Sequence, residues 1–288
     1  MDFSHLIDDF LHIQPRLEID TPAGWTQGRT AYGGLTGALM LAAVQAAFVD
    51  LPPLRTIQIN FVGPASGRLK VSSDLLRRGK NNVTIEALLT GDDAIAGRAI
   101  FTFGVSRDTQ TQAHYPRRDD VTPPEETPEL VWGAFGPEFL AQFEACAINT
   151  SMPLSGAEAA DNLLWLRHKD AGARDGIVPL IALGDAPPPA VLSMMKTVRG
   201  ISSMNWNINM LSDAPHTRDG WWLMHTFSQH VGNGYASQIM RVWDADGTRV
   251  MDAMQLIAPS NSHAVSRPAP VTPPMGRHAL ALASDLGA

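Results

Sequence analysis

The sequence predicts an α+β fold made of two tandem copies of one unit, in which a helix is wrapped by an antiparallel sheet. The first observation is the segment 35–48, which carries no charge and is too short to cross a membrane. The second is the series of short segments with alternating polarity that follows it, separated by turn residues. The third is a later block, 150–258, that repeats this layout.

In the first block, Gly33 and Gly34 open the apolar segment. A helix without a polar face must be enclosed on most sides, so we expect a sheet to surround it. Turn residues at 79–82 and 91–93 favour hairpins between the strands that follow. The expected strands are 16–20, 56–61, 69–76, 83–89 and 97–105.

The second block predicts the same order of elements. Its first strand is expected at 165–167, and a helix is expected from Pro189 to Met195 because proline suits the first turn. Strands are expected at 204–209, 221–228, 235–243 and 249–257. Gly67 and Gly79 precede Gly220 and Gly232 by the same 153 residues, and the last strands keep that register. We interpret this as an internal duplication.

Proline-rich stretches give the domain boundaries. We expect a first repeat over 1–110, a linker extended over the surface at 111–149, a second repeat over 150–258 and a tail at 259–288. The tail is expected to be poorly ordered or draped over the body.

Composition limits the class of protein. The chain has 288 residues, of which 44% are hydrophobic and 18% charged, which is typical of a globular protein. A net charge of −7 without a run of Lys or Arg argues against nucleic acid as a partner. The single cysteine, Cys146, and a start unlike a signal peptide predict a cytoplasmic location. No apolar stretch is long enough for membrane insertion.

Three groups of residues support a family resemblance. They are Tyr32-Gly33-Gly34 before the Ala-rich segment, the turn 78–81 (Arg-Gly-Lys-Asn), and the stretch 234–255 with its Trp243 and Gly247. Their order over about residues 15–258 resembles the thioesterase-like superfamily related to acyl-CoA thioesterase II. The resemblance implies a double hotdog fold. It also implies a hydrolase of lipid metabolism that cleaves acyl-CoA thioesters without a metal or redox cofactor.

The resemblance also implies a water molecule oriented by an Asp, a Thr or Ser, and a Gln of the second repeat. The matching positions here are Asn205, Gln229 and Gln255. This sequence departs from the family at two positions, because Asn205 replaces the Asp and Gln229 replaces the Thr or Ser. Asn cannot act as a general base near neutral pH, so the departures weaken the case for hydrolysis, whereas acyl-thioester binding stays plausible. His230 is a substitute base, although strand alternation turns it away from Gln229. His225 shares the face of Gln229 only in a strand without a bulge.

Each of these assignments has a structural alternative. Asn205 and Gln255 could simply satisfy buried backbone groups. Gly33 and Gly34, after Tyr32, could either present helix N–H groups to a carbonyl oxygen that gains charge or form a tight turn. In the second repeat, the prolines at 187–189 occupy the equivalent stretch, so the two repeats are not expected to be equivalent sites.

The hairpin at 77–82 suggests a second substrate contact. Arg78 and Asn81, with Arg77 and Lys80, could meet the phosphates of CoA, or could be ordinary solvated side chains.

Other functions remain open on the sequence. The same fold without a competent base would be a non-catalytic acyl-thioester or fatty-acyl binding protein. A hydratase would need an acidic residue with a nearby His on the central helix, and 33–48 has neither. The spacing of the His residues predicts no metal site. Because a sheet of this kind leaves long edges, we expect a homodimer or a larger homo-oligomer.

Overall fold

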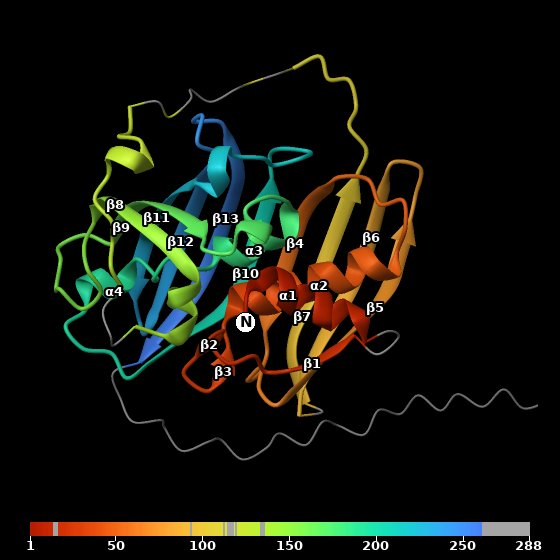
Figure 1. The fold of residues 1–288 in the computed structure, drawn as a ribbon, viewed down its shortest axis with the longest axis horizontal. Coiled ribbons are helices and arrows are strands. Elements are labelled where there is room, and N and C mark those ends of the chain that lie inside the picture. Colours follow the sequence, from red (N-terminus) through yellow and green to blue (C-terminus); the bar gives the residue numbers. More distant parts are fainter. Residues whose placement is uncertain are drawn as a thin grey trace, which may run out of the picture.

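The computed structural model describes residues 1–13, 17–92, 94–111, 113, 118, 120–132 and 136–260. Eleven strands form one antiparallel sheet in the order β1-β5-β6-β7-β4-β10-β13-β12-β11-β9-β8. The helices α1, α2 and α3 lie together against one face of this sheet (Figure 1). The predicted double hotdog fold is confirmed. The predicted tail falls outside the described residues, apart from its first two positions.

The first half contains the helix and strands that the sequence predicts, in the predicted order. It also contains a short N-terminal helix and a two-stranded ribbon that were not predicted. The elements are α1 (Phe3–His12), β1 (Glu18–Asp20), β2 (Thr26–Gln27), β3 (Thr30–Ala31), α2 (Gly33–Ala47), β4 (Leu54–Phe61), β5 (Arg68–Arg78), β6 (Asn82–Gly91) and β7 (Ala94–Gly104).

The second half follows the same plan, with 3-10 turns at Pro124–Glu126, Glu138–Gln142, Ala171–Ala173 and Arg218–Gly220. Its other elements are β8 (Phe143–Thr150), β9 (Asp161–His168), α3 (Ile177–Gly184), α4 (Val191–Met194), β10 (Gly200–Met210), β11 (Trp222–Gly232), β12 (Tyr235–Trp243) and β13 (Arg249–Ser260).

Two elements differ from the prediction. The helix expected from Pro189 to Met195 is the one-turn α4, and the main helix of this half is α3, which ends before three consecutive prolines. Proline supplies no backbone N–H, so the helix cannot continue through 187–189. In addition, all of β8 except its last residue lies inside the range 111–149 expected to be a linker.

The two halves join edge to edge through β4 and β10, where Ile57 faces Ile208. Equivalent pairs can therefore be compared. Ile85 pairs with Phe101 in the first half, whereas Gln238 pairs with Gln255 in the second. Gln238 follows Ile85 by 153 residues, as predicted, but Gln255 follows Phe101 by 154. The register predicted for the last strand of the second half is therefore wrong by one residue. An apolar pair in one half is thus replaced by two amides in the other.

The helix α2 is enclosed, as its uncharged sequence predicts. All residues from 34 to 44 are buried. Gly37 allows close packing, because a Cβ there would lie 3.1 Å from Ile59 and 3.3 Å from Ile181. The helix is therefore held between the sheet and α3.

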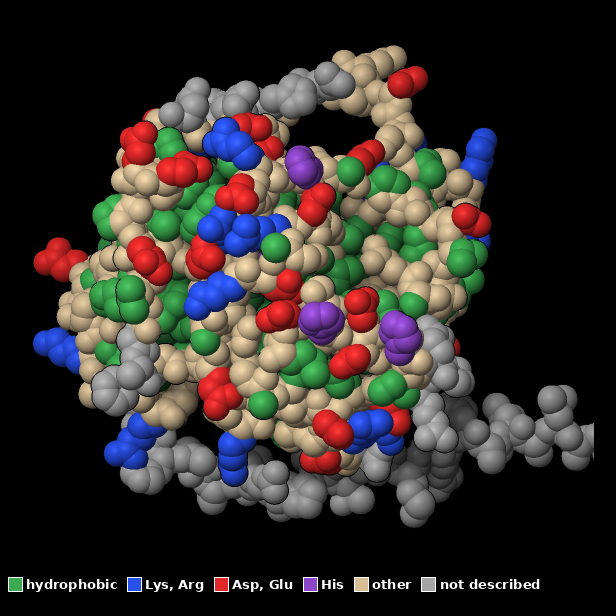
Figure 2. Space-filling view, viewed as in Figure 1, with side chains coloured by type: hydrophobic (Ala, Val, Ile, Leu, Met, Phe, Trp, Pro, Cys, Tyr) green, Lys and Arg blue, Asp and Glu red, His purple; other side chains and the backbone are tan. Residues whose placement is uncertain are grey.

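Acidic and basic side chains are interspersed over the helical face of the molecule (Figure 2). None of the helices in the described ranges has the length and hydropathy needed to span a membrane.

Candidate functional site

The residue Asp185 follows directly after the last turn of α3 and is half-buried. Its carboxylate accepts hydrogen bonds from the backbone N–H of Gly34 and from Nε2 of Gln255. Burial raises the pKa of this carboxyl group to about 6, and the two hydrogen bonds act in the opposite direction. A carboxyl group with a pKa this close to neutrality suits a general base, which must be deprotonated at working pH and still accept a proton.

The start of α2 is built around Asp185. A Cβ added to Gly33 would lie 2.5 Å from Oδ2 of Asp185 and 3.0 Å from the ring of Phe61. Only glycine leaves room for the carboxylate at this position. The first half of the chain therefore supplies the helix N-terminus, and the second half supplies the acid.

Tyr32 connects the two helices. Its hydroxyl donates to the backbone carbonyl of Ala182 in α3 at 2.5 Å, and its ring stacks on Phe139 with centroids 4.1 Å apart. Burial, with the nearby charge of Asp185, raises the pKa of Tyr32 well above its usual value, so the hydroxyl stays protonated. The residue expected to bind substrate is thus engaged in holding α2 against α3.

A chain of hydrogen bonds leads to Asp185 from the backbone. The N–H of Ala190 donates to Oε1 of Gln238 at 3.0 Å, and Nε2 of Gln238 donates to Oε1 of Gln255 at 3.0 Å. Nε2 of Gln255 then donates to Asp185. A backbone N–H can only donate and a carboxylate can only accept, so the two ends fix the orientation of both amides. We call this series the amide relay; both glutamines are 1% exposed.

Ser228 lies beside the amide relay, because it faces Gln238 across β11 and β12. Its hydroxyl oxygen is buried and has no hydrogen-bond partner. The register shifts between Ser228 and His230, which places Gln229 in a bulge with its side chain exposed. Ser228, one residue before the position that the resemblance matches to a Thr or Ser, therefore shares the face of Gln238.

Of the three residues expected to orient water, the structure places only Gln255 beside a carboxylate. Asn205 follows a bulge in β10, and its Oδ1 accepts from the backbone N–H of Leu256 at 3.0 Å. It therefore bonds a backbone N–H at an exposed position, whereas the structural alternative was a buried one. The two histidines considered as a base also lie elsewhere: His230 is exposed, and His225 bonds Asp161 at 2.9 Å.

Arg78 and Asn81 lie at the tip of the β5–β6 hairpin in the first half, where Arg78 is exposed. β6 and β13 are separated by β7, β4 and β10. At about 4.8 Å per strand, roughly 19 Å of sheet lies between this hairpin and Gln255. The structure does not bring these residues to Asp185.

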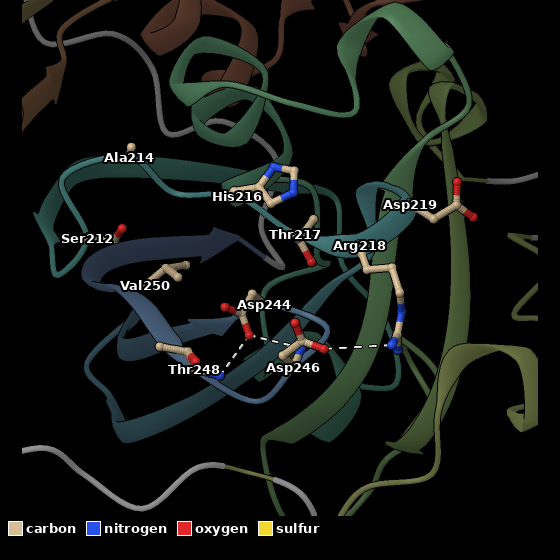
Figure 3. A pocket seen from close by; sticks show the side chains of 10 residues that line it. All are labelled: Ser212, Ala214, His216, Thr217, Arg218, Asp219, Asp244, Asp246, Thr248 and Val250. Carbon is tan, nitrogen blue, oxygen red and sulfur yellow. Dashed lines mark hydrogen bonds and ion pairs between the residues drawn. The ribbon is translucent and has the colours of Figure 1, made fainter.

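A cavity of about 710 Å³ lies between the loop 212–219 and the turn 244–248 (Figure 3). Its charged lining groups pair with one another or with neighbours: Arg218 with Asp246 at 3.7 Å, and His216 with Asp175 at 3.2 Å. A second cavity of about 300 Å³ adjoins it at Ser212. Neither cavity includes a residue of the relay. Among the residues that the structure describes, no cluster of three metal-ligating side chains occurs.

Sequence reasoning missed Asp185, although a signal is present. It is the only charged residue between Asp175 and Lys196, and it stands between an apolar run and three prolines. A charged residue at the end of an apolar segment is expected to lie close to the core. There it needs hydrogen-bond partners. The family resemblance pointed instead to Asn205.

Two family models match this chain. The acyl-CoA thioesterase N-terminal domain matches residues 21–104, and the acyl-CoA thioesterase C-terminal domain matches residues 117–258. Together they cover well over half of the sequence. No curated protein sequence matches this chain.

Solved structures with the same fold are distant in sequence. A hotdog-fold protein of unknown function from Alicyclobacillus acidocaldarius has a TM-score of 0.78 at 20% identity, covering 90% of this chain and 99% of its own. A protein from Thermobifida fusca, provisionally named a thioesterase II, has a TM-score of 0.72 at 16% identity, covering 88% and 97%. The tesB protein of Mycobacterium avium subs paratuberculosis has a TM-score of 0.69 at 16% identity, covering 89% and 98%. At these identities the likeness establishes the fold.

Proposed function

The chain belongs to the acyl-CoA thioesterase family, and from this premise we propose that it hydrolyses acyl-CoA thioesters with Asp185 as the general base. The observation that supports the proposal most strongly is the half-buried carboxyl group of Asp185, which accepts hydrogen bonds from Gly34 and Gln255 and has a pKa raised to about 6. This group takes the role expected of a carboxylate at Asn205.

The proposed reaction needs one water molecule and no other reactant. The carboxylate of Asp185 takes a proton as the water oxygen bonds to the thioester carbon. The carbon–sulfur bond then breaks, and the leaving thiolate takes the proton from Asp185. The products are the free acid and CoA, and Asp185 returns to its ionised form.

The neighbouring groups have supporting roles in this proposal. Because the amide relay fixes Gln255, the second N–H of its Nε2 is available to a water or to the carbonyl oxygen of the thioester. The N-terminal end of α2, which carries no acidic residue in its first turn, favours negative charge on that oxygen. Ser228 supplies the hydroxyl group that the family resemblance places near Gln255.

The test is thiol release from acyl-CoA of several chain lengths in water enriched in ¹⁸O. The wild-type protein is expected to release CoA and to place one ¹⁸O atom in each acid formed. Asp185→Asn keeps the size of the side chain but removes the base, so kcat is expected to fall by about 10²–10⁴-fold. Asp74→Asn, at an exposed position of β5, is the matched control and is expected to keep the wild-type rate.

The alternative function has a different outcome in the same experiment. A fatty-acyl binding protein would bind a non-hydrolysable thioether analogue of acyl-CoA and would release no thiol from the thioester. That result, with a correctly folded wild-type protein, would overturn the proposed hydrolysis.

A further inference from the structure

Of the buried polar atoms without a hydrogen-bond partner in the described residues, three lie near one another on β9 and β11. They are Oδ1 of Asn162, Oγ1 of Thr226 and Oγ of Ser228. Thr226 is 0% exposed and Asn162 is 3% exposed. Leaving such a group unpaired costs about 1–3 kcal/mol, so buried polar groups in folded proteins nearly always have a partner. The grouping indicates that a polar atom from outside the chain belongs here.

The positions of these atoms continue the surface that carries the amide relay. Ser228 faces Gln238, and two residues earlier on β11 Thr226 faces Met240 on one side and Asn162 of β9 on the other. Since alternate residues share a face, all of them point to the side of the sheet on which α3 and α4 lie. A polar track therefore runs from Gln255 towards β9.

The equivalent surface of the first half is less polar. By the same offset of 153 residues, Ser228 corresponds to Leu75 and Thr226 to Ser73 of β5, and the pair equivalent to the two glutamines is Ile85 with Phe101. The two amides and the hydroxyl of Ser228 are thus particular to the second half, whereas a hydroxyl residue stands at the Thr226 position in both halves.

From these contacts we propose that the acyl group of the substrate carries a hydroxyl group towards its far end, and that Thr226 and Asn162 bind it. This inference rests on the proposed function. Strand spacing places β11 about 10 Å and β9 about 15 Å across the sheet from Gln255, where the thioester would lie. The bound group is therefore distant from the reacting carbon.

The chemistry of the two side chains selects a hydroxyl group. Oδ1 of Asn162 can only accept a hydrogen bond, so the ligand must donate to it. A carboxylate or a ketone cannot donate. A hydroxyl group can donate to Asn162 and accept from the Thr226 hydroxyl at the same time, which satisfies both atoms.

The experiment compares CoA thioesters of equal length with and without a terminal hydroxyl group, over a series of chain lengths. At the length that reaches Thr226, kcat/KM for the hydroxylated substrate is expected to exceed that of the plain substrate by about 10-fold or more. Thr226→Val and Asn162→Leu should each remove most of this preference while keeping hydrolysis of the plain thioester. Thr102→Val, on the first-half strand β7, is the control and should keep the preference.

Two outcomes would overturn the inference. If the wild-type protein shows no preference for the hydroxylated substrate at any chain length, ordered water satisfies these atoms. If Thr226→Val keeps the preference, another site binds the hydroxyl group. If no thioester is hydrolysed, the proposed function fails. The same pairs, as thioether analogues in a calorimetric binding assay, then still show whether the hydroxylated chain binds more tightly.

Discussion

Gly33 and Asp185 lie so close that a Cβ on the glycine would stand 2.5 Å from Oδ2 of the carboxylate. The two residues belong to different halves of a duplicated chain, at the start of α2 and at the end of α3. The site is therefore formed by both repeats, although only the second repeat supplies the acid and the amides.

Gly33→Ala is expected to lower kcat by about 10–100-fold, because the new methyl group must displace the carboxylate from its position against α2. The measurement is steady-state thiol release, with circular dichroism to check folding. Gly79→Ala is the matched control, since its Cβ would find nothing nearer than 3.6 Å. Equal activity of the two variants would show that the position of Asp185 does not matter for the rate.

Gln255→Met is expected to move the pH dependence of the reaction. The hydrogen bond from Gln255 lowers the pKa of Asp185, so its loss should raise that pKa above about 6. The apparent pKa of kcat/KM should shift to higher pH, and the rate should fall more at pH 6 than at pH 9. Gln58→Met, at an exposed position of β4, should leave the profile in place. A lower rate without a shift would contradict this role of the amide.

Tyr32→Phe is expected to reduce stability and to leave substrate binding nearly unchanged. The substitution leaves the buried carbonyl of Ala182 without its partner, which costs about 1–3 kcal/mol of the free energy of unfolding. Denaturant unfolding measures this loss, and KM should stay within about threefold. Tyr235→Phe, at a tyrosine that is 46% exposed, is the control. A large rise in KM with unchanged stability would restore Tyr32 as a substrate contact.

Stability should also depend on pH through Asp185. Its pKa is raised in the folded state, so between about pH 4 and pH 6 the folded chain holds a proton that the unfolded chain has lost. The contribution of this residue to the free energy of unfolding therefore falls as pH rises through that window. Asp185→Asn removes the effect, so the stability of the variant relative to wild type should rise by on the order of 1–3 kcal/mol from pH 4 to pH 7. A difference independent of pH would contradict the raised pKa.

Much of the fold follows from patterns that are local in the sequence. The segment 35–48 has no polar face, and the alternation at 56–61 has period two, so the enclosed helix and β4 could both be predicted. The helix α3 was missed because its eight residues are mostly apolar and show no helical periodicity. The helix was instead predicted at 189–195, because proline is common in the first turn of a helix.

The candidate site depends on register, which a sequence alone does not fix. One bulge lies between Ser203 and Asn205, and another between Ser228 and His230. Each shift of one residue turns a side chain to the other face of the sheet. Gln255 could be identified from the family resemblance, whereas the contacts of Asp185 with Gly33 and Gln255 become evident only in the structure, where α3 ends against the start of α2.

The most direct test of Asp185 as the base is the pH dependence of kcat/KM for the wild-type protein and for Asp185→Asn, measured side by side. We expect the wild-type value to rise with an apparent pKa of about 6 and then to level off, because only the ionised carboxylate accepts the proton. The variant should be about 100-fold slower or more, without that titration. A variant that keeps the wild-type rate, or that titrates with the same pKa, would contradict the assignment.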